Sequence, residues 1–340
     1  MRNLKRVTRA DVAKEAGVTE TIVSYVINNN RYVDKEKRLS VEKAIKKLHY
    51  HPNFAARALK GKKTDHILVV ADDIMSDHFG KIISEMEKIA YDRNCFISLC
   101  SSRNDEQFIN LVYEHFFDGI LIGSITLSEE NIQRLVDTGI PIVLLENRDY
   151  SMITGIYGKI DTGIYTGARQ CVKALYEKGR RNLLYVDRMD TESGQPVHID
   201  YRYNGFFDQL KEYNIKHNIS QVVYGYKSED ELRRKLFQYI KDEQKVPDGI
   251  MCFTDDVACM VMEIVKDMGY HIPLDISIIG FNNSKIGRYT SPTLSSVEIP
   301  RGEIGKSAMK ILTELIDHKE DVISPIVEKL KTRLVIRESI

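Results

Sequence analysis

The apolar residues of this chain follow a helical period over the first fifty residues and a strand-like pattern from residue 66 onward. Two short helices are predicted between residues 9 and 28. Their common apolar face consists of Val12, Ala13, Ala16, Ile22, Val23, Val26 and Ile27. Thr8 followed by Asp11 predicts a capping box at the start of the first helix. Gly17 suits the left-handed backbone angle that ends this helix, and Thr19 can cap the second.

The spacing of small residues predicts that these two helices cross closely. Ala13 is small, Gly17 allows a tight turn, and Val23 is a β-branched residue suited to the crossing point. This is the arrangement of a helix-turn-helix, whose second helix enters the major groove of DNA. An ordinary helical hairpin inside a larger core would have the same spacing, so spacing alone leaves both interpretations open.

A third helix and a short fourth one are predicted before the pattern changes. The third runs from about Lys35 to His49 and can close a three-helix core. The fourth is the segment NFAARALK after Pro52, which ends at Gly61. Because a helix of about two turns is marginal in water, we expect it to form only when something packs against it. A plain linker is the alternative, and residues 61–65 are the expected domain boundary.

Apolar runs of strand length alternate with amphipathic helical stretches from His66 to the end of the chain. The runs are HILVVA from His66, CFISLC from Cys95, GILIG from Gly119, PIVLLE from Pro141, NLLYVD from Asn182, QVVYGY from Gln221, GIMCF from Gly249 and ISIIGF from Ile276. Strands that are apolar on both faces and separated by helices indicate parallel sheets covered on both sides. Eight runs suggest two sheets with a cleft at the carboxyl ends of the strands. The segments DGILIG and PDGIMCF hint at a duplicated layout.

The distribution of charge favours the helix-turn-helix over the helical hairpin. Residues 1–64 hold 16 Lys and Arg against 6 Asp and Glu, a surplus of +10. The rest of the chain holds 33 basic and 43 acidic residues, a surplus of −10. A neutral protein that concentrates its positive charge beside such a motif is expected to bind the phosphates of nucleic acid.

Length and composition predict a cytoplasmic protein of two or three domains. No apolar run of the 340 residues approaches a membrane span, and no hydrophobic region follows the basic N-terminus. Five cysteines are scattered without a CxxC pair, which favours buried thiols over disulfides or zinc. They are Cys95, Cys100, Cys171, Cys252 and Cys259.

The motifs of common enzymes are absent from the sequence. Gly305-Lys306-Ser307 resembles the end of a phosphate-binding loop, but Pro300 occupies the place of its first glycine. No GxGxxG or GxSxG occurs, and no nucleophile–base pair can be named. His49 and His51 alone are too few ligands to indicate a metal site. We therefore expect neither enzymatic activity nor a cofactor.

The chain resembles, nearly from end to end, the lac/galactose-repressor family of bacterial transcription regulators. Besides Arg202 and Gly205, the resemblance is carried by DVAKEAGVTETIVSYVIN from Asp11, LHYHPNFAARALKGKKT from Leu48, FTDDVA from Phe253, IPLDISIIGFNN from Ile272 and YTSPTLSSV from Tyr289. It implies a multidomain protein with an all-α helix-turn-helix head (residues 1–51) and a hinge helix with linker (52–65). An α/β two-lobed core with parallel sheets, like that of periplasmic binding proteins, would follow (66–340), binding effector and forming a dimer.

The resemblance also implies which residues contact DNA. Those in the head are Thr8, Thr19, Glu20, Thr21, Ser24, Tyr25 and Asn28, and those in the hinge are Asn53, Ala56, Arg57 and Leu59. Leu59 matches the family's minor-groove wedge, which kinks DNA by separating a base step. Tyr25 stands where the family commonly has arginine or histidine, and a phenol lacks the two-donor fork that reads guanine. The operator sequence therefore stays open, although Glu20 suits a cytosine.

For the effector cleft, the resemblance and the strand ends point to six residues. They are Asp73, Phe79, Glu146, Arg202, Tyr226 and Asp255. Carboxylates can accept from hydroxyl groups, a guanidinium can donate to ring oxygens, and an aromatic face can cover apolar C–H groups. These acidic residues could also simply face solvent, and Phe79 could belong to the core. Asn282 replaces an aspartate that is frequent in the family, and Tyr226 could substitute for the missing tryptophan.

These features together predict a sequence-specific repressor of carbohydrate uptake or catabolism that a small sugar or sugar phosphate releases from DNA. We expect a homodimer on a near-palindromic operator, because TRLVIRE near the end is not followed by a leucine heptad. One alternative is a corepressed regulator, in which a ligand or a phosphocarrier protein strengthens DNA binding. Another is a cytoplasmic small-molecule binding module or an α/β enzyme with a helical head.

Overall fold

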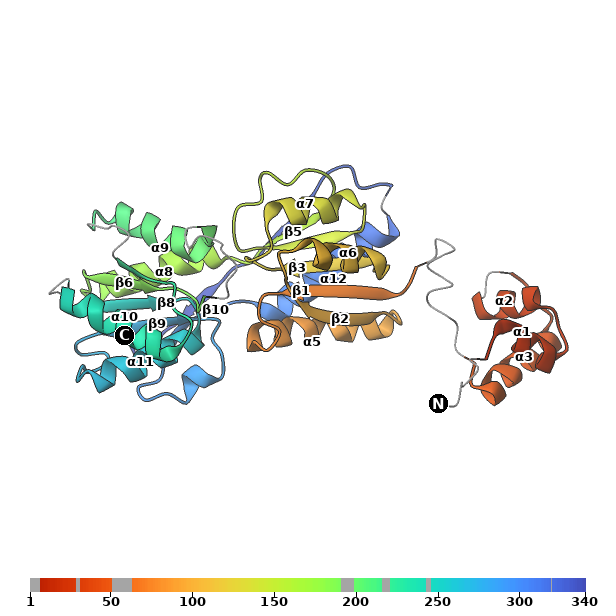
Figure 1. Cartoon of the computed structure of the whole chain (residues 1–340), viewed down its shortest axis with the longest axis horizontal. Helices are drawn as coiled ribbons and strands as arrows, with labels where there is room; N and C mark the ends of the chain where they lie inside the picture. The colour runs from red at the N-terminus through yellow and green to blue at the C-terminus, as the bar shows by residue number, and fades with distance from the viewer. Residues whose placement is uncertain are drawn as a thin grey trace. The chain divides into compact units, whose positions relative to one another are not determined.

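The computed structural model describes residues 7–28, 31–50, 63–190, 199–215, 221–242, 246–318 and 320–340 (Figure 1). The chain divides into two compact units, Met1–Thr64 and Asp65–Ile340, which we call the head and the core. The predicted hinge helix, with Asn53, Ala56, Arg57 and Leu59, lies outside the described residues. No helix among the described residues has both the length and the apolar character needed to cross a membrane.

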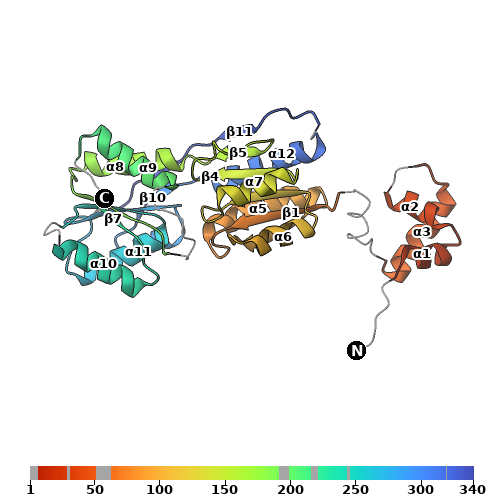
Figure 2. The same ribbon diagram turned by 45° about the horizontal axis from the view of Figure 1, so that its top comes forward.

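The head is a three-helix bundle made of α1 (Arg9–Ala16), α2 (Glu20–Asn28) and α3 (Lys35–Leu48) (Figure 2). Its core consists of Val12, Ala13, Val23, Val26, Val41, Ala44 and Tyr50. The predicted capping box is confirmed, since Thr8 and Asp11 each accept a hydrogen bond from the other's backbone N–H. Gly17 ends α1 in the left-handed conformation, with φ 66°. The helix-turn-helix predicted from the spacing is therefore present.

The core contains two six-stranded sheets, as the alternating pattern predicts. The first has the order β11-β5-β4-β3-β1-β2 and is parallel throughout. Its strands are β1 (His66–Ala71), β2 (Phe96–Ser101), β3 (Gly119–Gly123), β4 (Ile142–Glu146), β5 (Gly158–Asp161) and β11 (Ile326–Lys329). The second has the order β12-β10-β9-β8-β6-β7, in which β12 alone is antiparallel. Its strands are β6 (Leu183–Val186), β7 (Val222–Val223), β8 (Gly249–Cys252), β9 (Ser277–Phe281), β10 (Ser295–Glu298) and β12 (Arg333–Val335).

The hint of a duplicated layout is confirmed by the order of the strands. The segment DGILIG forms β3 and the segment PDGIMCF forms β8, and each strand is the fourth from the same edge of its sheet. Three of the four strands without a predicted run, β5, β10 and β11, have half-polar sequences (GKID, SSVE and IVEK). None of the three contains more than two apolar residues in succession, so the sequence pattern missed them.

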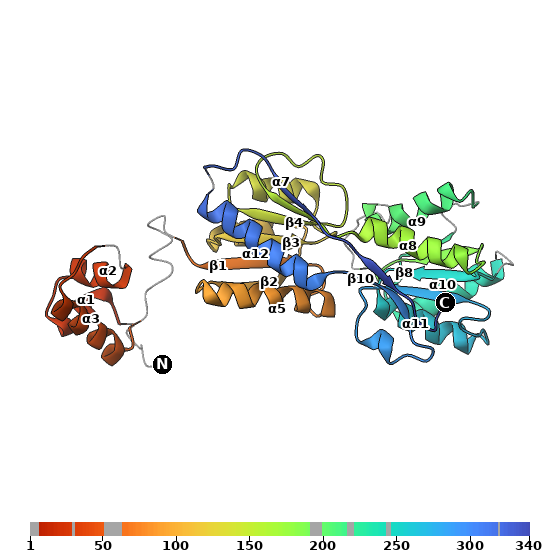
Figure 3. The same ribbon diagram turned by 180° about the vertical axis from the view of Figure 1, so that it is seen from behind.

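Helices cover both faces of each sheet (Figure 3). On the first sheet, α5 (Asp77–Asp92) and α12 (Arg301–Asp317) lie opposite α6 (Glu106–Glu114) and α7 (Glu129–Asp137). Alternate residues of β1 divide between the two layers, with Ile67 and Val69 toward α5 and Leu68 and Val70 toward α6. On the second sheet, α8 (Ile164–Glu177) and α9 (Tyr201–Glu212) lie opposite α10 (Glu229–Asp242) and α11 (Asp255–Asp267). A short 3-10 helix, η3 (Ile286–Arg288), follows β9.

The chain passes between the two lobes three times, after β5, after β10 and after β11. The first and third passages run side by side. Leu330 donates from its backbone N–H to the carbonyl of Asp161 at 2.8 Å, and the Thr332 hydroxyl donates to the carbonyl of Gly163 at 2.9 Å. A Cβ at Gly163, where φ is 74°, would lie 2.9 Å from the Leu330 carbonyl oxygen. Glycine therefore lets these two passages approach each other closely.

Candidate DNA-binding surface and effector cavity

Four of the predicted DNA-contacting residues of the head, Glu20, Thr21, Ser24 and Tyr25, lie on α2 and are less buried than the residues that face the bundle. Val23 and Val26 are buried against α1 and α3, whereas Glu20 and Thr21 are exposed and Tyr25 is half-buried. Ser24 is also half-buried, and Asn28 is the last residue of α2. Because α2 is the second helix of the motif, its less buried side is the one that can enter a major groove.

Thr8 and Thr19 cap the starts of α1 and α2, as the sequence predicts. The Thr8 hydroxyl accepts from the Asp11 backbone N–H at 3.3 Å and donates to the Asp11 carboxylate at 2.7 Å. The Thr19 hydroxyl accepts from the Ile22 backbone N–H at 3.4 Å. Both threonines are exposed. Their positions at two adjacent helix starts leave one face of each accessible to a phosphate.

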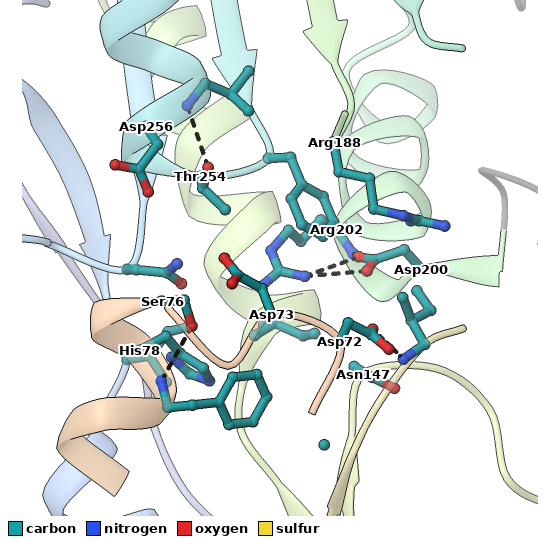
Figure 4. A pocket seen from close by; sticks show the side chains of 18 of the residues that line it. Asp72, Asp73, Ser76, His78, Asn147, Arg188, Asp200, Arg202, Thr254 and Asp256 are labelled. Atoms are coloured by element: carbon teal, nitrogen blue, oxygen red, sulfur yellow. Dashed lines mark hydrogen bonds and ion pairs between the residues drawn. The ribbon is translucent and has the colours of Figure 1, made fainter. Parts of the chain in front are cut away.

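A cavity of about 570 Å³ lies between the two lobes of the core, at the carboxyl ends of both sheets (Figure 4). This is where open α/β sheets bind ligands. The polar residues that line it from the first lobe are Asp72, Asp73, Ser76, Asp77, His78 and Asn147. Those from the second lobe and its boundary are Thr162, Arg188, Asp200, Arg202, Thr254, Asp256, Asn282 and Ser284. Apolar side chains, among them Phe79, Ile125, Phe253 and Met260, complete the wall.

Three of the six predicted effector-binding residues line this cavity. Asp73 lies in the loop between β1 and α5, Phe79 belongs to the first turn of α5, and Arg202 belongs to the first turn of α9. Glu146, Tyr226 and Asp255 are not part of its lining. The prediction of an effector contact is therefore corrected for these three positions.

Glu146 and Asp255 each stand one residue away from a residue that does line the cavity. The Glu146 carboxylate accepts from Lys159 Nζ at 3.0 Å, and Asn147 takes the place at the cavity. Asp255 is fully buried and accepts from the Ser284 N–H and the Ser296 hydroxyl, both at 2.5 Å, while Asp256 lines the cavity. Successive residues at a strand end or helix start point in different directions, so a motif match is ambiguous by one position.

Tyr226 belongs to the core of the second lobe instead of the cavity. It is fully buried among the side chains between β8 and α11, and its hydroxyl donates to the backbone carbonyl of Asp187 at 2.5 Å. The buried aromatic ring is thus held by packing and its polar end by one backbone oxygen. It cannot stack on a ligand, and Phe253 and Phe79 provide the aromatic surface instead.

Four buried polar atoms of the lining have no hydrogen-bond partner among the residues that the structure describes. They are His78 Nδ1, Arg188 Nη1, Arg202 Nε and Asn282 Oδ1. Buried polar groups are nearly always paired, so this set is an unusual concentration of unused hydrogen-bonding capacity beside one cavity. Arg202 is held in place by Asp200, which accepts from Nη1 at 3.1 Å (Figure 4). The ring centroid of Phe253 lies 4.3 Å from Cζ of Arg202.

His78 is a neutral member of this set. Burial, assisted by the positive charges of Arg202 and Arg301, lowers the pKa of His78 to about 3. A neutral imidazole has one donor and one acceptor nitrogen, so His78 can pair with a hydroxyl group in either direction. His78 was not predicted from the sequence, because no spacing or motif distinguishes a cavity histidine from one at the surface.

Asp72 has a positioning role at the same wall. Its carboxylate accepts from the backbone N–H groups of Ile125 and Thr126 at 2.7 and 3.4 Å and from the hydroxyls of Ser102, Ser124 and Thr126. A carboxylate with this many donors is satisfied without a ligand. It ties the loop after β3 to the end of β1 and so fixes the first-lobe side of the cavity.

Asn282 stands at the end of β9 with a positive φ of 97°. Such an angle is uncommon for a residue with a side chain and is often found at functional sites. The following residue, Asn283, makes two side-chain hydrogen bonds. Its Oδ1 accepts from Arg337 at 2.6 Å, and its Nδ2 donates to Glu298 at 3.2 Å. Asn282 itself lines the cavity. No cluster of His, Cys, Asp and Glu suited to a metal ion occurs among the described residues.

Comparison with known proteins found relatives of both the head and the core. Residues 8–53 match the bacterial regulatory proteins of the lacI family, and residues 172–340 match a periplasmic binding protein-like domain. Catabolite control protein A of Priestia megaterium is 31% identical over 98% of this chain and 99% of its own length. The HTH-type transcriptional repressor PurR of Pectobacterium carotovorum subsp. carotovorum (strain PC1) is 30% identical over 92% of each chain. A solved complex of the transcriptional regulator CelR with cellobiose covers 98% of this chain and all of its own, with a TM-score of 0.70 and 23% identity.

Head, core and cavity thus define a two-part regulator, in which a DNA-binding unit is joined to a ligand-binding one. The chain belongs to the lacI family of bacterial regulatory proteins. Its helix-turn-helix makes it a DNA-binding transcription regulator.

Proposed function

We propose that this protein is a cytoplasmic, homodimeric repressor of carbohydrate uptake or catabolism whose effector is a neutral polyhydroxylated molecule of sugar size. The observation that carries the proposal is the set of four unpaired polar atoms at the cavity. Arg188 and Arg202 offer N–H donors, Asn282 offers an acceptor, and the neutral His78 can act as either. Hydroxyl groups both donate and accept, so they satisfy all three kinds of partner.

The charges around the cavity favour a neutral ligand over a phosphorylated one. Arg202 already faces Asp200 at 3.1 Å, and Arg188 Nη1 lies 4.0 Å from Asp187. Burial, together with the charges of Asp73 and Asp77, raises the pKa of Asp256. The positive charges of Arg188 and Arg202 are thus balanced by neighbouring carboxylates. A further anion in the cavity would be repelled by the carboxylates of the wall. The apolar faces of Phe79 and Phe253 suit the C–H surface of a sugar ring.

On the DNA side, we propose that α2 meets base edges through Glu20, Thr21, Ser24, Tyr25 and Asn28, with Thr8 and Thr19 near phosphate. Asn53, Ala56, Arg57 and Leu59 would act in the minor groove at the centre of a near-palindromic operator. The positive surplus of residues 1–64 supports this assignment, since phosphate contacts release counterions. An effector that favours one arrangement of the lobes would then weaken the paired hinge helices and release DNA.

The test is selection of genomic DNA fragments by the full-length protein, followed by gel shifts on the enriched fragment with a panel of sugars. The panel contains cellobiose, ribose, other neutral mono- and disaccharides and their phosphates. We expect one neutral sugar to release the fragment. Release by a phosphorylated sugar alone would contradict the proposed ligand class. Tighter DNA binding with ligand would show corepression, and enrichment only in the presence of a phosphocarrier protein would show that such a partner is required.

A pair of arginine substitutions separates the effector site from the fold. Arg202→Met removes the buried donor, so the variant should bind the selected fragment and no longer respond to the sugar. Arg234→Met on α10 is the matched control, because the Arg234 side chain is 75% exposed and does not line the cavity. The control should respond like the wild type. Equal responses of both variants would place the effector elsewhere.

A further inference from the structure

Arg31 lies over the ring of Tyr25, one of the residues of α2 that we propose to contact DNA. Its guanidinium carbon lies 5.3 Å from the ring centroid, within the range of a cation–π contact. Arg31 is exposed, and no hydrogen bond or ion pair joins it to any residue in the described part of the chain. The donors of this guanidinium are therefore available to a partner outside the head.

The two side chains have complementary chemistry for reading a base. Tyr25 alone has one hydroxyl, which cannot make the two parallel hydrogen bonds that distinguish guanine. A guanidinium stacked on an aromatic face keeps its N–H groups free at the edge of its plane. The stacking also restricts the arginine to fewer rotamers, so less entropy is lost when it meets DNA. Tyr25 lies on α2, whereas Arg31 comes from the connection to α3, so the contact joins two successive elements of the head.

We propose that Arg31, supported by the Tyr25 ring, is a specificity-determining residue that reads one guanine in each operator half-site. This inference rests on the proposed DNA contacts of α2 and adds a residue outside that helix. It assigns Tyr25 the role of a platform and Arg31 the role of the two-pronged donor. Such a donor contacts O6 and N7 of guanine in the major groove.

The experiment is selection from a library of randomised DNA duplexes with the full-length protein and six variants. The wild type should enrich guanine at one position of each half-site. Arg31→Ala should lose this preference at that position alone, by roughly fivefold to a hundredfold in relative affinity, and keep the preferences at the others. Arg31→Lys should retain part of it. Tyr25→Phe keeps the ring and should retain the preference, whereas Tyr25→Leu should lose it as Arg31→Ala does.

Two comparisons make the result decisive. If the residues act as one unit, the double variant with Arg31→Ala and Tyr25→Leu should lose no more discrimination at that position than either single variant. Lys43→Ala, at an exposed position of α3, is the matched control for loss of one positive charge and should leave the guanine preference unchanged. Thermal unfolding of each variant checks that the head is intact.

The contrary outcomes are distinct. A uniform loss of affinity for all sequences, with the salt dependence reduced by about one phosphate contact, would show that Arg31 binds backbone and would overturn the proposal. Unchanged selection by Arg31→Ala would overturn it as well, while the proposed function stood. If the wild type enriched no sequence at all, the proposed operator binding would fail first, and this inference with it.

Discussion

Arg301, at the first position of α12, donates from Nη1 to Oδ2 of Asp77 at the start of α5, with 3.0 Å between the two atoms. The same guanidinium donates from Nη2 to the backbone carbonyl of Asn283 at 3.3 Å. Asp77 belongs to the first lobe and Asn283 follows the last residues of β9 in the second. Arg301 is buried, and through these two bonds it joins the lobes beside the cavity.

Replacement of Arg301 by methionine should weaken the contact between the lobes. Methionine has a similar length but donates no hydrogen bond, so the Asp77 carboxylate and the Asn283 carbonyl lose a partner. We expect the free energy of unfolding of the core to fall by about 1 to 3 kcal/mol, measured by urea denaturation. Lys81→Met is the control, because Lys81 pairs with the same carboxylate at 3.2 Å from an exposed position. It should cost roughly 0.5 kcal/mol or less, and an equal loss in both variants would refute the role of Arg301.

The stability of the core should carry a pH dependence from Asp187, a residue that is 3% exposed. Burial, opposed by Arg188 and reinforced by Asp200, raises the pKa of Asp187 to about 6. Because this pKa lies above that of the unfolded chain, about 3.9, ionisation of Asp187 costs stability as pH rises from about 4 to about 6. Asp187→Asn removes the cost. From about pH 5 to about pH 7.5, the variant should gain about 1 to 2 kcal/mol over the wild type.

Urea denaturation at the two pH values measures this difference. The matched control is Asp230→Asn, a substitution at an exposed carboxylate on α10. Its effect on the free energy of unfolding should be small and equal at both pH values. A gain by Asp187→Asn that was the same at both pH values would show that the buried carboxyl does not titrate in this range.

Glycine substitutions at two helical positions should change the stability of the core in opposite directions. A Cβ at Gly205 would lie 2.4 Å from the backbone oxygen of Tyr165, so Gly205→Ala must push α9 away from α8. We expect a loss of roughly 1 to 3 kcal/mol. Gly80 in α5 has open space around it, and Gly80→Ala should stabilise by about 0.5 to 1 kcal/mol through its helix propensity. Midpoints of thermal unfolding that shifted in the same direction would contradict the packing argument.

The capping box of α1 should determine the stability of the start of the head. Thr8→Ala removes the hydroxyl that pairs with Asp11 and should cost about 1 kcal/mol. Thr8→Ser keeps a hydroxyl at the same place and should stay within a few tenths of the wild type. Amide hydrogen exchange over residues 9–16 measures the difference locally. Equal exchange rates in the two variants would show that the cap contributes nothing.

The sequence predicted the strands whose side chains are apolar on both faces of the sheet. Runs such as HILVVA form β1 because a strand buried on both sides needs apolar residues at every position. β5 (GKID) and β11 (IVEK) were missed because neither contains more than two apolar residues in succession. The capping residues Thr8 and Gly17 were found because their effect is local and depends on only a few neighbours.

The cavity was predicted less completely than the fold. Asp73, Phe79 and Arg202 were found at its wall, but Glu146 and Asp255 were each taken one residue too early. A shift of one residue at a strand end reverses the direction of the side chain, and no sequence motif resolves it. Tyr226 was misplaced for another reason, since a tyrosine near a strand end can face either a cavity or a core. Only the packing of β8 and α11 around it decides that.

By itself, the sequence determined the order of the helices and strands, the concentration of positive charge in the first 64 residues and the family resemblance, because these depend on periodicity, composition and contiguous motifs. Only the tertiary structure decided which polar atoms stay unpaired beside the cavity, which carboxylates balance Arg188 and Arg202, and which arginine lies on Tyr25. Those relationships join residues far apart in the chain or on different helices. Their energies depend on burial and on distances of a few ångströms, which no local pattern encodes.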